Sequence, residues 1–398
     1  MKIKLILLLT SLLTVLFISA NTFGQEKTTN LDEVDSYLNK TFKEQNFVGL
    51  GACLIKENKI QWMKTYGYAD REIKELLRND NIFQLASLSK VFTAAAIMQL
   101  YEKGLFSLDD DINNYLPFSV RNPNFPDKPI TFRMLLTHTA SFDDLLPMGN
   151  KISLGVNGDC QTPLSEYVKE LFVPGGKYYS IDYFSKVEPG TKYLYSNISF
   201  SLLGYLVESI IKQDFSEYCK KNIFDPLNMT NTGWHLKDLD TNNIAYCYGG
   251  RLTDTTAAYQ KIVHFGLPGY PEGMLRTTME DLSHFIIAIL NDGRYDNYEI
   301  LRPETVKLML TPQGIKNILS RSFPVDDIGI TWHKVNVDGK TYYSMNGFSG
   351  SIFTNTMFSK ENNTAIIYFF TGISLKNMQT SNGISKLLIN AVENFEVE

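Results

Sequence analysis

The stretch Asn81–Gly104 constrains this chain most, because it joins a short strand pattern to an apolar helix through a serine. Phe83-Gln84-Leu85 ends a strand-like run, and the residues after Ser87 have helical apolar spacing up to the stop at Gly104. Lys90 follows Ser87 by three residues, which makes the two side chains neighbours on one helix face. A hydroxyl nucleophile here has an amine base within reach and lies where free helical N–H groups favour an oxyanion.

The Ser-x-x-Lys spacing alone is a weak signal, because the chain contains it twice. The second pair, Ser209 and Lys212, belongs to the amphipathic run Leu202–Ile211, which predicts an ordinary exposed helix face. Ser87 differs from Ser209 in its flanking sequence and in the motifs that follow it.

The segment Phe83–Pro117 resembles the serine β-lactamase and penicillin-binding-protein superfamily. The likeness is closest to the class C β-lactamase-related serine hydrolases, which include esterases and D-amino-acid-specific peptidases. It spans about Phe47 to Gly372, and further matches follow in family order at Ile130–Ser141, Glu188–Glu208 and Gly273–Phe285. The resemblance implies an α+β hydrolase with its site between two lobes.

The strand and helix patterns predict the same α+β class: an antiparallel β-sheet flanked by helices and interrupted in sequence by a mainly helical lobe. We expect one catalytic domain over residues 25–398, with a sheet lobe at about 30–85 and 232–398 and a helical lobe at about 86–231. The expected elements are a helix at Leu31–Gln45 and strands at Val48–Ile55, Ile60–Tyr66, Ile328–Val335, Lys340–Met345, Ser351–Phe358 and Thr364–Phe370. Turns are expected at Glu57-Asn58-Lys59 and at Asp338-Gly339.

The N-terminus predicts export. Residues 1–24 read as a bacterial signal peptide with Lys2 and Lys4 before an apolar run, and cleavage is expected after Ala20 or Gly24. The alternative is an uncleaved membrane anchor, since the run is near spanning length. There is no second long apolar run, so the mature protein is expected to be periplasmic or secreted, without a stable membrane span.

Charge and composition exclude several partners. Removing Lys2 and Lys4 changes the formal net charge from −5 to −7, which argues against a nucleic-acid surface. The four cysteines and five histidines show no metal-ligand spacing, so we predict no metal and no cofactor, and mostly unpaired thiols. The expected partner is a small-molecule or peptide substrate, and the oligomeric state stays open.

Tyr195 and Asn197 form the second predicted catalytic element. Tyr-x-Asn occurs three times, but only this copy has a family context; the others are Tyr37/Asn39 and Tyr295/Asn297. The resemblance implies that Tyr195 accepts or relays the proton of the nucleophile. It implies that Asn197 hydrogen-bonds the substrate amide and the lysine. Whether Lys90 or Tyr195 takes the proton is left open by the sequence.

The third element departs from the family pattern. The family has Lys-Thr-Gly or His-x-Gly on the strand lining the site, and the matching residues here are Met345-Asn346-Gly347, followed by Phe348. We predict that these four residues bind substrate, with the Phe348 N–H as second oxyanion donor. Met345 has no charge, which predicts weaker recognition of carboxylate substrates and reduced catalysis.

Two minor predictions concern the neighbourhood of the site. His138 lies where the family has a structural histidine, so it is expected to pack, and Asp143 and Asp144 are expected to be solvated loop carboxylates. The aromatic stretch between Ser141 and Glu188 either shapes a pocket or covers the helical lobe.

Two functions of different classes follow. The first is an exported serine hydrolase that forms an acyl-enzyme on Ser87 and acts on an ester, an amide, a D-amino-acid peptide or a β-lactam. Among these, Met345 favours a non-anionic ester or amide. The alternative is a catalytically weak or inactive binding or sensing protein of the same fold. The intact set Ser87, Lys90, Tyr195 and Asn197 favours the hydrolase.

Overall fold

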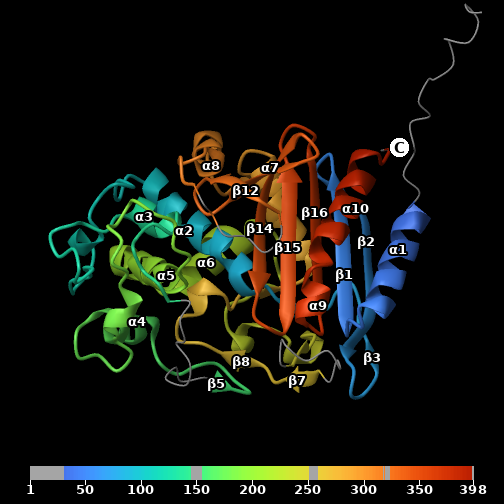
Figure 1. Ribbon diagram of the computed structural model, residues 1–398, viewed down its shortest axis with the longest axis horizontal. Coiled ribbons are helices and arrows are strands. Elements are labelled where there is room, and N and C mark those ends of the chain that lie inside the picture. The colour runs from blue at the N-terminus through green and yellow to red at the C-terminus, as the bar shows by residue number, and fades with distance from the viewer. Residues whose placement is uncertain (1–30, 145–154, 251–258, 317, 319–322, 397–398) are drawn as a thin grey trace, which may run out of the picture.

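The computed structural model describes residues 31–144, 155–250, 259–316, 318 and 323–396 (Figure 1). The predicted signal peptide lies outside these residues, so its cleavage and the export that it implies stay predictions. No helix within the described ranges is long and apolar enough to span a bilayer.

The largest sheet among the described residues is antiparallel and has eight strands in the order β12-β13-β14-β15-β16-β1-β2-β3. Their bounds are β1 Gly49–Lys56, β2 Lys59–Asp70, β3 Glu75–Leu76, β12 Val325–Ile328, β13 His333–Val337, β14 Lys340–Phe348, β15 Ile352–Ser359 and β16 Thr364–Thr371. N-terminal β1 pairs with C-terminal β16 over its full length. The sheet is thus completed by segments from both ends of the chain, as predicted, and the α+β fold class is confirmed.

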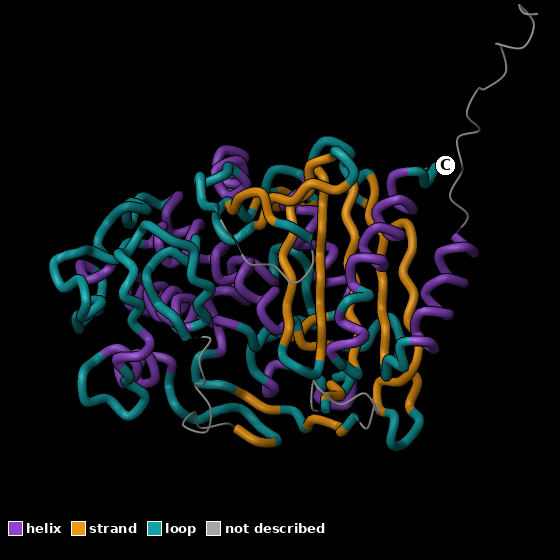
Figure 2. Tube along the Cα trace, in the orientation of Figure 1, coloured by secondary structure: helices purple, strands orange, loops and turns teal. Residues whose placement is uncertain are grey.

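Helices cover both faces of this sheet (Figures 1 and 2). The helices are α1 Leu31–Glu44, α2 Lys90–Glu102, α3 Phe132–Leu136, α4 Leu164–Phe172, α5 Ile198–Ile211, α6 Phe215–Cys219, α7 Met279–Leu290, α8 Pro303–Leu310, α9 Leu375–Met378 and α10 Ser381–Glu393. Strand β1 is buried on both sides because its side chains alternate between two cores. Leu50 and Leu54 pack with α1 and α10, whereas Cys53 and Ile55 pack with α2 and α7.

The predicted hairpins are confirmed. Lys56 pairs with Lys59, and the two turn residues between them, Glu57 and Asn58, both have positive φ. The same geometry recurs at Asp338-Gly339 between β13 and β14. Positive φ at both central residues gives the turn a twist that matches the flanking strands.

The prediction of one strand over Ile328–Val335 is wrong. Strand β12 ends at Ile328 and β13 begins at His333, with Thr331 in the left-handed region between them at φ 72°. Ile330 and Trp332 are fully buried although they are not in a strand. The apolar run therefore reflects burial of a turn in the core rather than extended structure.

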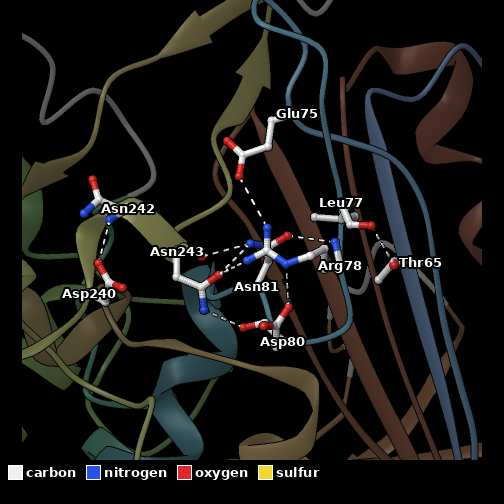
Figure 3. A network of polar contacts seen from close by, with 9 residues as sticks. All are labelled: Thr65, Glu75, Leu77, Arg78, Asp80, Asn81, Asp240, Asn242 and Asn243. Carbon is white, nitrogen blue, oxygen red and sulfur yellow. Dashed lines mark hydrogen bonds and ion pairs between the residues drawn. The ribbon is translucent and has the colours of Figure 1, made fainter.

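Four two-stranded pairs lie in the connecting segments that the structure describes: β4 Phe83–Gln84 with β9 Arg276–Thr277, β5 Gly155–Val156 with β8 Phe265–Gly266, β6 Cys247–Gly249 with β7 Gln260–Ile262, and β10 Arg294–Tyr295 with β11 Tyr298–Glu299. Ahead of β4, a polar network joins two segments that are far apart in sequence (Figure 3). The Asn243 side chain accepts hydrogen bonds from Arg78 and Asn81 at 2.8 Å each and donates one to the Asp80 carbonyl at 2.7 Å. This network fixes the entry to the Ser87 segment.

Candidate active site

Ser87 lies on a tight turn between β4 and α2. The turn is a 3₁₀ segment, Ala86–Ser89, that continues directly into α2. Ala86 has φ 50°, an uncommon backbone conformation for a residue with a Cβ, and it is held there because both flanks are pinned. The Leu85 N–H donates to the Leu275 carbonyl at 2.9 Å, and Ser89 Oγ accepts from the Leu275 N–H at 3.1 Å. Ser87 is thereby presented at a helix start, where N–H groups have no intrahelical acceptor.

Lys90 is fully buried and makes three polar contacts. Its Nζ is 3.3 Å from Ser87 Oγ, 2.9 Å from Asn197 Oδ1 and 2.5 Å from the Glu272 carbonyl oxygen. The last two atoms can only accept hydrogen bonds, so two N–H groups of the amine are directed at them. The third position of Nζ faces Ser87, where either a proton of the ammonium or the lone pair of the neutral amine fits.

Tyr195 and Asn197 reach the same point from the segment that precedes α5. Tyr195 Oη is 2.7 Å from Ser87 Oγ, and Lys90 Nζ lies 5.3 Å from the centre of the Tyr195 ring. The structure therefore brings together all four predicted catalytic residues, although more than a hundred positions separate the two pairs in the sequence.

His138 packs against the Tyr195 ring, as predicted for a structural histidine. The ring centres are 4.5 Å apart in a stacked arrangement, and Nδ1 accepts the Ser196 N–H at 3.1 Å. Burial, with a smaller contribution from the Lys90 charge, holds the pKa of His138 well below its usual value. A neutral imidazole thus supports the tyrosine from behind.

Asp144 is not a solvated loop carboxylate, and that prediction is wrong. The side chain is buried and accepts the N–H groups of Asn197 at 2.9 Å and Ile198 at 3.1 Å, at the start of α5. Burial raises the pKa of Asp144, whereas these N–H donors and the Lys90 charge oppose the rise. The carboxylate caps the helix and fixes the backbone at Asn197.

Strand β14 borders the site through Gly347. A Cβ at this position would lie 2.0 Å from the Leu85 carbonyl oxygen and 2.9 Å from the Leu88 nitrogen, so only glycine allows this approach. Met345 is on the same face but is buried in the core. Phe348 packs in the opposite core, beside α1 and α10, and Asn346 shares its face by strand alternation. Substrate contacts of Asn346 and Phe348 would accordingly be made by backbone atoms.

Two residues near Lys90 were missed by the sequence analysis. The Glu272 side chain is buried and accepts a hydrogen bond from Ser201 Oγ at 2.6 Å. Ser201 lies in the family-like segment Glu188–Glu208, and Glu272 immediately precedes the segment Gly273–Phe285. Neither residue belongs to a motif, and only their packing beside Lys90 distinguishes them.

The other Ser-x-x-Lys and Tyr-x-Asn matches in the sequence are not part of the candidate site around Ser87. Ser209 Oγ donates to the Tyr115 carbonyl oxygen at 2.5 Å, and Lys212 ends α5 in the left-handed conformation. Tyr37 lies on α1, and Tyr295 on the hairpin β10–β11.

In the stretch 155–188, Tyr178 and Phe184 belong to the core of the helical lobe, which supports the covering role for those aromatics. Within the part of the chain that the structure describes, no group of three or more His, Cys, Asp or Glu side chains is placed to hold a metal ion.

Comparison with known proteins gives a consistent result. The family model described as Beta-lactamase matches residues 34–382. Protein flp of Staphylococcus aureus strain MRSA252 is 25% identical over 309 residues, which cover 77% of this chain and 58% of that protein. The chain thus spans little more than half the length of the curated relatives of this kind.

Among the solved structures that share the fold, two serve as examples. The penicillin-binding protein homologue from Pyrococcus abyssi superposes with a TM-score of 0.72 at 19% identity, covering 93% of this chain and 79% of that one. D-amino acid amidase from Ochrobactrum anthropi has a TM-score of 0.72 at 18% identity, covering 91% of this chain and 98% of that one. At such identities these likenesses concern the fold.

Proposed function

The chain belongs to the β-lactamase family of serine hydrolases, and we propose that it is an exported enzyme that forms an acyl-enzyme on Ser87. Membership in this family confirms the resemblance inferred from the motifs. The observation that carries the catalytic assignment is the convergence on Ser87 Oγ of Tyr195 Oη at 2.7 Å and Lys90 Nζ at 3.3 Å. Export is proposed from the sequence of residues 1–24.

In the first step Ser87 Oγ attacks the substrate carbonyl, and its proton passes to Tyr195 or Lys90. The carbonyl oxygen becomes an oxyanion at the helix start, where the Ser87 N–H is one donor and the Phe348 N–H is the predicted second one. The leaving group takes the proton as the tetrahedral intermediate collapses. A water then attacks the carbonyl carbon of the acyl-enzyme ester and gives a proton to the same base. The bond to Ser87 Oγ breaks, the base returns the proton to Oγ, and the acid is released.

Asn197 has two roles in this proposal. Its Oδ1 accepts from Lys90 Nζ, which leaves the side-chain NH₂ to hydrogen-bond a substrate carbonyl. Asp144 and His138 hold the segment around Asn197 and Tyr195, so the catalytic atoms are fixed before substrate arrives.

For the substrate we propose a non-anionic ester or amide in preference to a β-lactam or a peptide carboxylate. The reason is Met345, a buried and uncharged side chain where the family pattern has a cation. The fold neighbour that is named as a D-amino acid amidase supports an amide among the candidates.

The test is intact mass after incubation with a fluorophosphonate and, separately, with penicillin. We expect a fluorophosphonate adduct on wild type, none on Ser87→Ala, and an unchanged adduct on Ser209→Ala, which alters the other Ser-x-x-Lys pair. Penicillin should give little or no adduct. A folded wild-type protein that reacts with neither reagent would overturn the hydrolase proposal and leave the binding or sensing protein.

A further inference from the structure

Glu272 lies directly behind Lys90, and the mechanism above does not use its side chain. It is the last residue of a 3₁₀ turn, Tyr270–Glu272, that packs against α2 and α5. Its carbonyl oxygen accepts from Lys90 Nζ at 2.5 Å, and its carboxylate accepts from Ser201 Oγ at 2.6 Å. The turn thus brings both a fixed acceptor and a titratable group to the buried amine.

The buried charges around Lys90 do not balance. Two buried carboxyl groups, Asp144 and Glu272, act on one ammonium group. Leaving a charge buried without a partner costs several kcal/mol. One of the two carboxyl groups is therefore expected to hold a proton when Lys90 carries its charge.

The hydrogen bonds indicate which carboxyl group is protonated. Asp144 accepts two backbone N–H groups at the positive end of α5, and such donors favour the ionised form. Glu272 has the hydroxyl of Ser201 as its side-chain donor. Burial raises the pKa of Glu272 to about 7, against the opposing effects of Lys90 and Ser201, while Asp144 adds to the rise. The neighbouring titratable group on α4 is Tyr167, whose pKa burial raises well above 10, so it is neutral over the relevant pH range.

We propose that Glu272 is a positioning residue whose carboxyl group controls the charge state of Lys90 and thereby makes acylation of Ser87 pH-dependent. This inference rests on the proposed function. When Glu272 releases its proton to solvent, the new negative charge stabilises the ammonium form of Lys90. If Lys90 is the base, the added negative charge makes it harder for the ammonium group to lose the proton that covers its lone pair. If Tyr195 is the base, its phenolate is disfavoured by the same negative charge. Acylation slows in both cases.

The experiment is the rate of fluorophosphonate labelling of Ser87 as a function of pH, on the full chain. Wild type should show a rate that falls as the pH rises through about 7, where the pKa of Glu272 lies. In Glu272→Gln, which keeps an acceptor for Ser201, this fall should disappear. In Ser201→Ala the fall should move up by about one pH unit, since a hydrogen bond to the charged carboxylate is lost.

Glu208 provides a matched control. It is a glutamate on α5, seven residues beyond Ser201, and burial also raises its pKa to about 7. Its carboxylate, however, accepts a hydrogen bond from the Phe215 N–H and not from Ser201. Glu208→Gln should keep the wild-type profile.

The possible results separate the two proposals. If wild type is not labelled at Ser87, the proposed function fails. If it is labelled but Glu272→Gln keeps the wild-type profile, or only scales the rate uniformly, the role of Glu272 is refuted. Should Glu272→Gln fail to fold, the profile of Ser201→Ala decides: an unshifted fall refutes the proposal.

Discussion

Replacing Gly347 by alanine should separate strand β14 from the Ser87 turn. The added Cβ would lie 2.0 Å from the Leu85 carbonyl oxygen and 2.5 Å from Thr354 Oγ1, whereas real Cβ contacts under 3.0 Å essentially never occur. To relieve this overlap, the Cβ and the Leu85 carbonyl oxygen have to separate by about 1 Å or more. The carbonyl belongs to backbone that hydrogen bonds hold in place between β4 and α2. The strand therefore has to move away from the nucleophile.

We expect two effects of this movement. Overpacking costs about 1–3 kcal/mol of unfolding free energy. A displacement of about 1 Å between the predicted oxyanion donors costs on the order of 100-fold in kcat/KM, which corresponds to about 2.7 kcal/mol in the barrier. The assay is hydrolysis of an activated neutral ester, together with urea unfolding of the same samples.

Gly158→Ala is the control, because a Cβ there meets nothing within 4 Å and its backbone needs no positive φ. It should leave both measurements close to wild type. A Gly347→Ala protein that is folded and retains kcat/KM within about threefold would refute the reasoning, since β14 could then not be part of the oxyanion site.

Two further predictions concern Asp144 and His333. Asp144→Ala should lower the unfolding free energy by about 0.5–2 kcal/mol, because the cap of α5 is lost. The kcat should fall as well, because Tyr195 and Asn197 lose their support. Asp144→Asn keeps a hydrogen-bond acceptor, so it should lose less stability and less activity. Burial lowers the pKa of His333 to about 4. The unfolded chain, with an ordinary histidine pKa of about 6.5, binds the proton first, so stability is complete above about pH 6.5 and is lost as the pH falls toward 4, by up to about 3 kcal/mol. Urea unfolding from pH 7 to 4 should show a smaller loss for His333→Gln; an equal loss would contradict this assignment.

Local sequence signals predicted much of the fold. The alternating and apolar runs located strands β1, β2, β14, β15 and β16 within a few residues, because those strands are bounded by turn residues such as Asp338-Gly339. The segment Gly329–Trp332 was misread because its apolar residues are buried in a turn, and burial leaves the same composition as a strand.

For the candidate site, the sequence by itself predicted which side chains would carry the proposed chemistry. Ser87, Lys90, Tyr195 and Asn197 were found from motifs, since a nucleophile and its proton acceptors need fixed residue types at fixed local spacing. Membership in the β-lactamase family could be inferred from the order of those motifs.

Only the tertiary structure decided the surroundings of those residues. Asp144 looked like an exposed carboxylate and proved to be a buried helix cap, and Glu272 and Ser201 showed no motif at all. Their effect depends on burial and on distance to Lys90, and both quantities arise when segments more than fifty residues apart pack together. Interactions between these buried charges follow no fixed spacing along the sequence, so they can be recognised only in the folded chain.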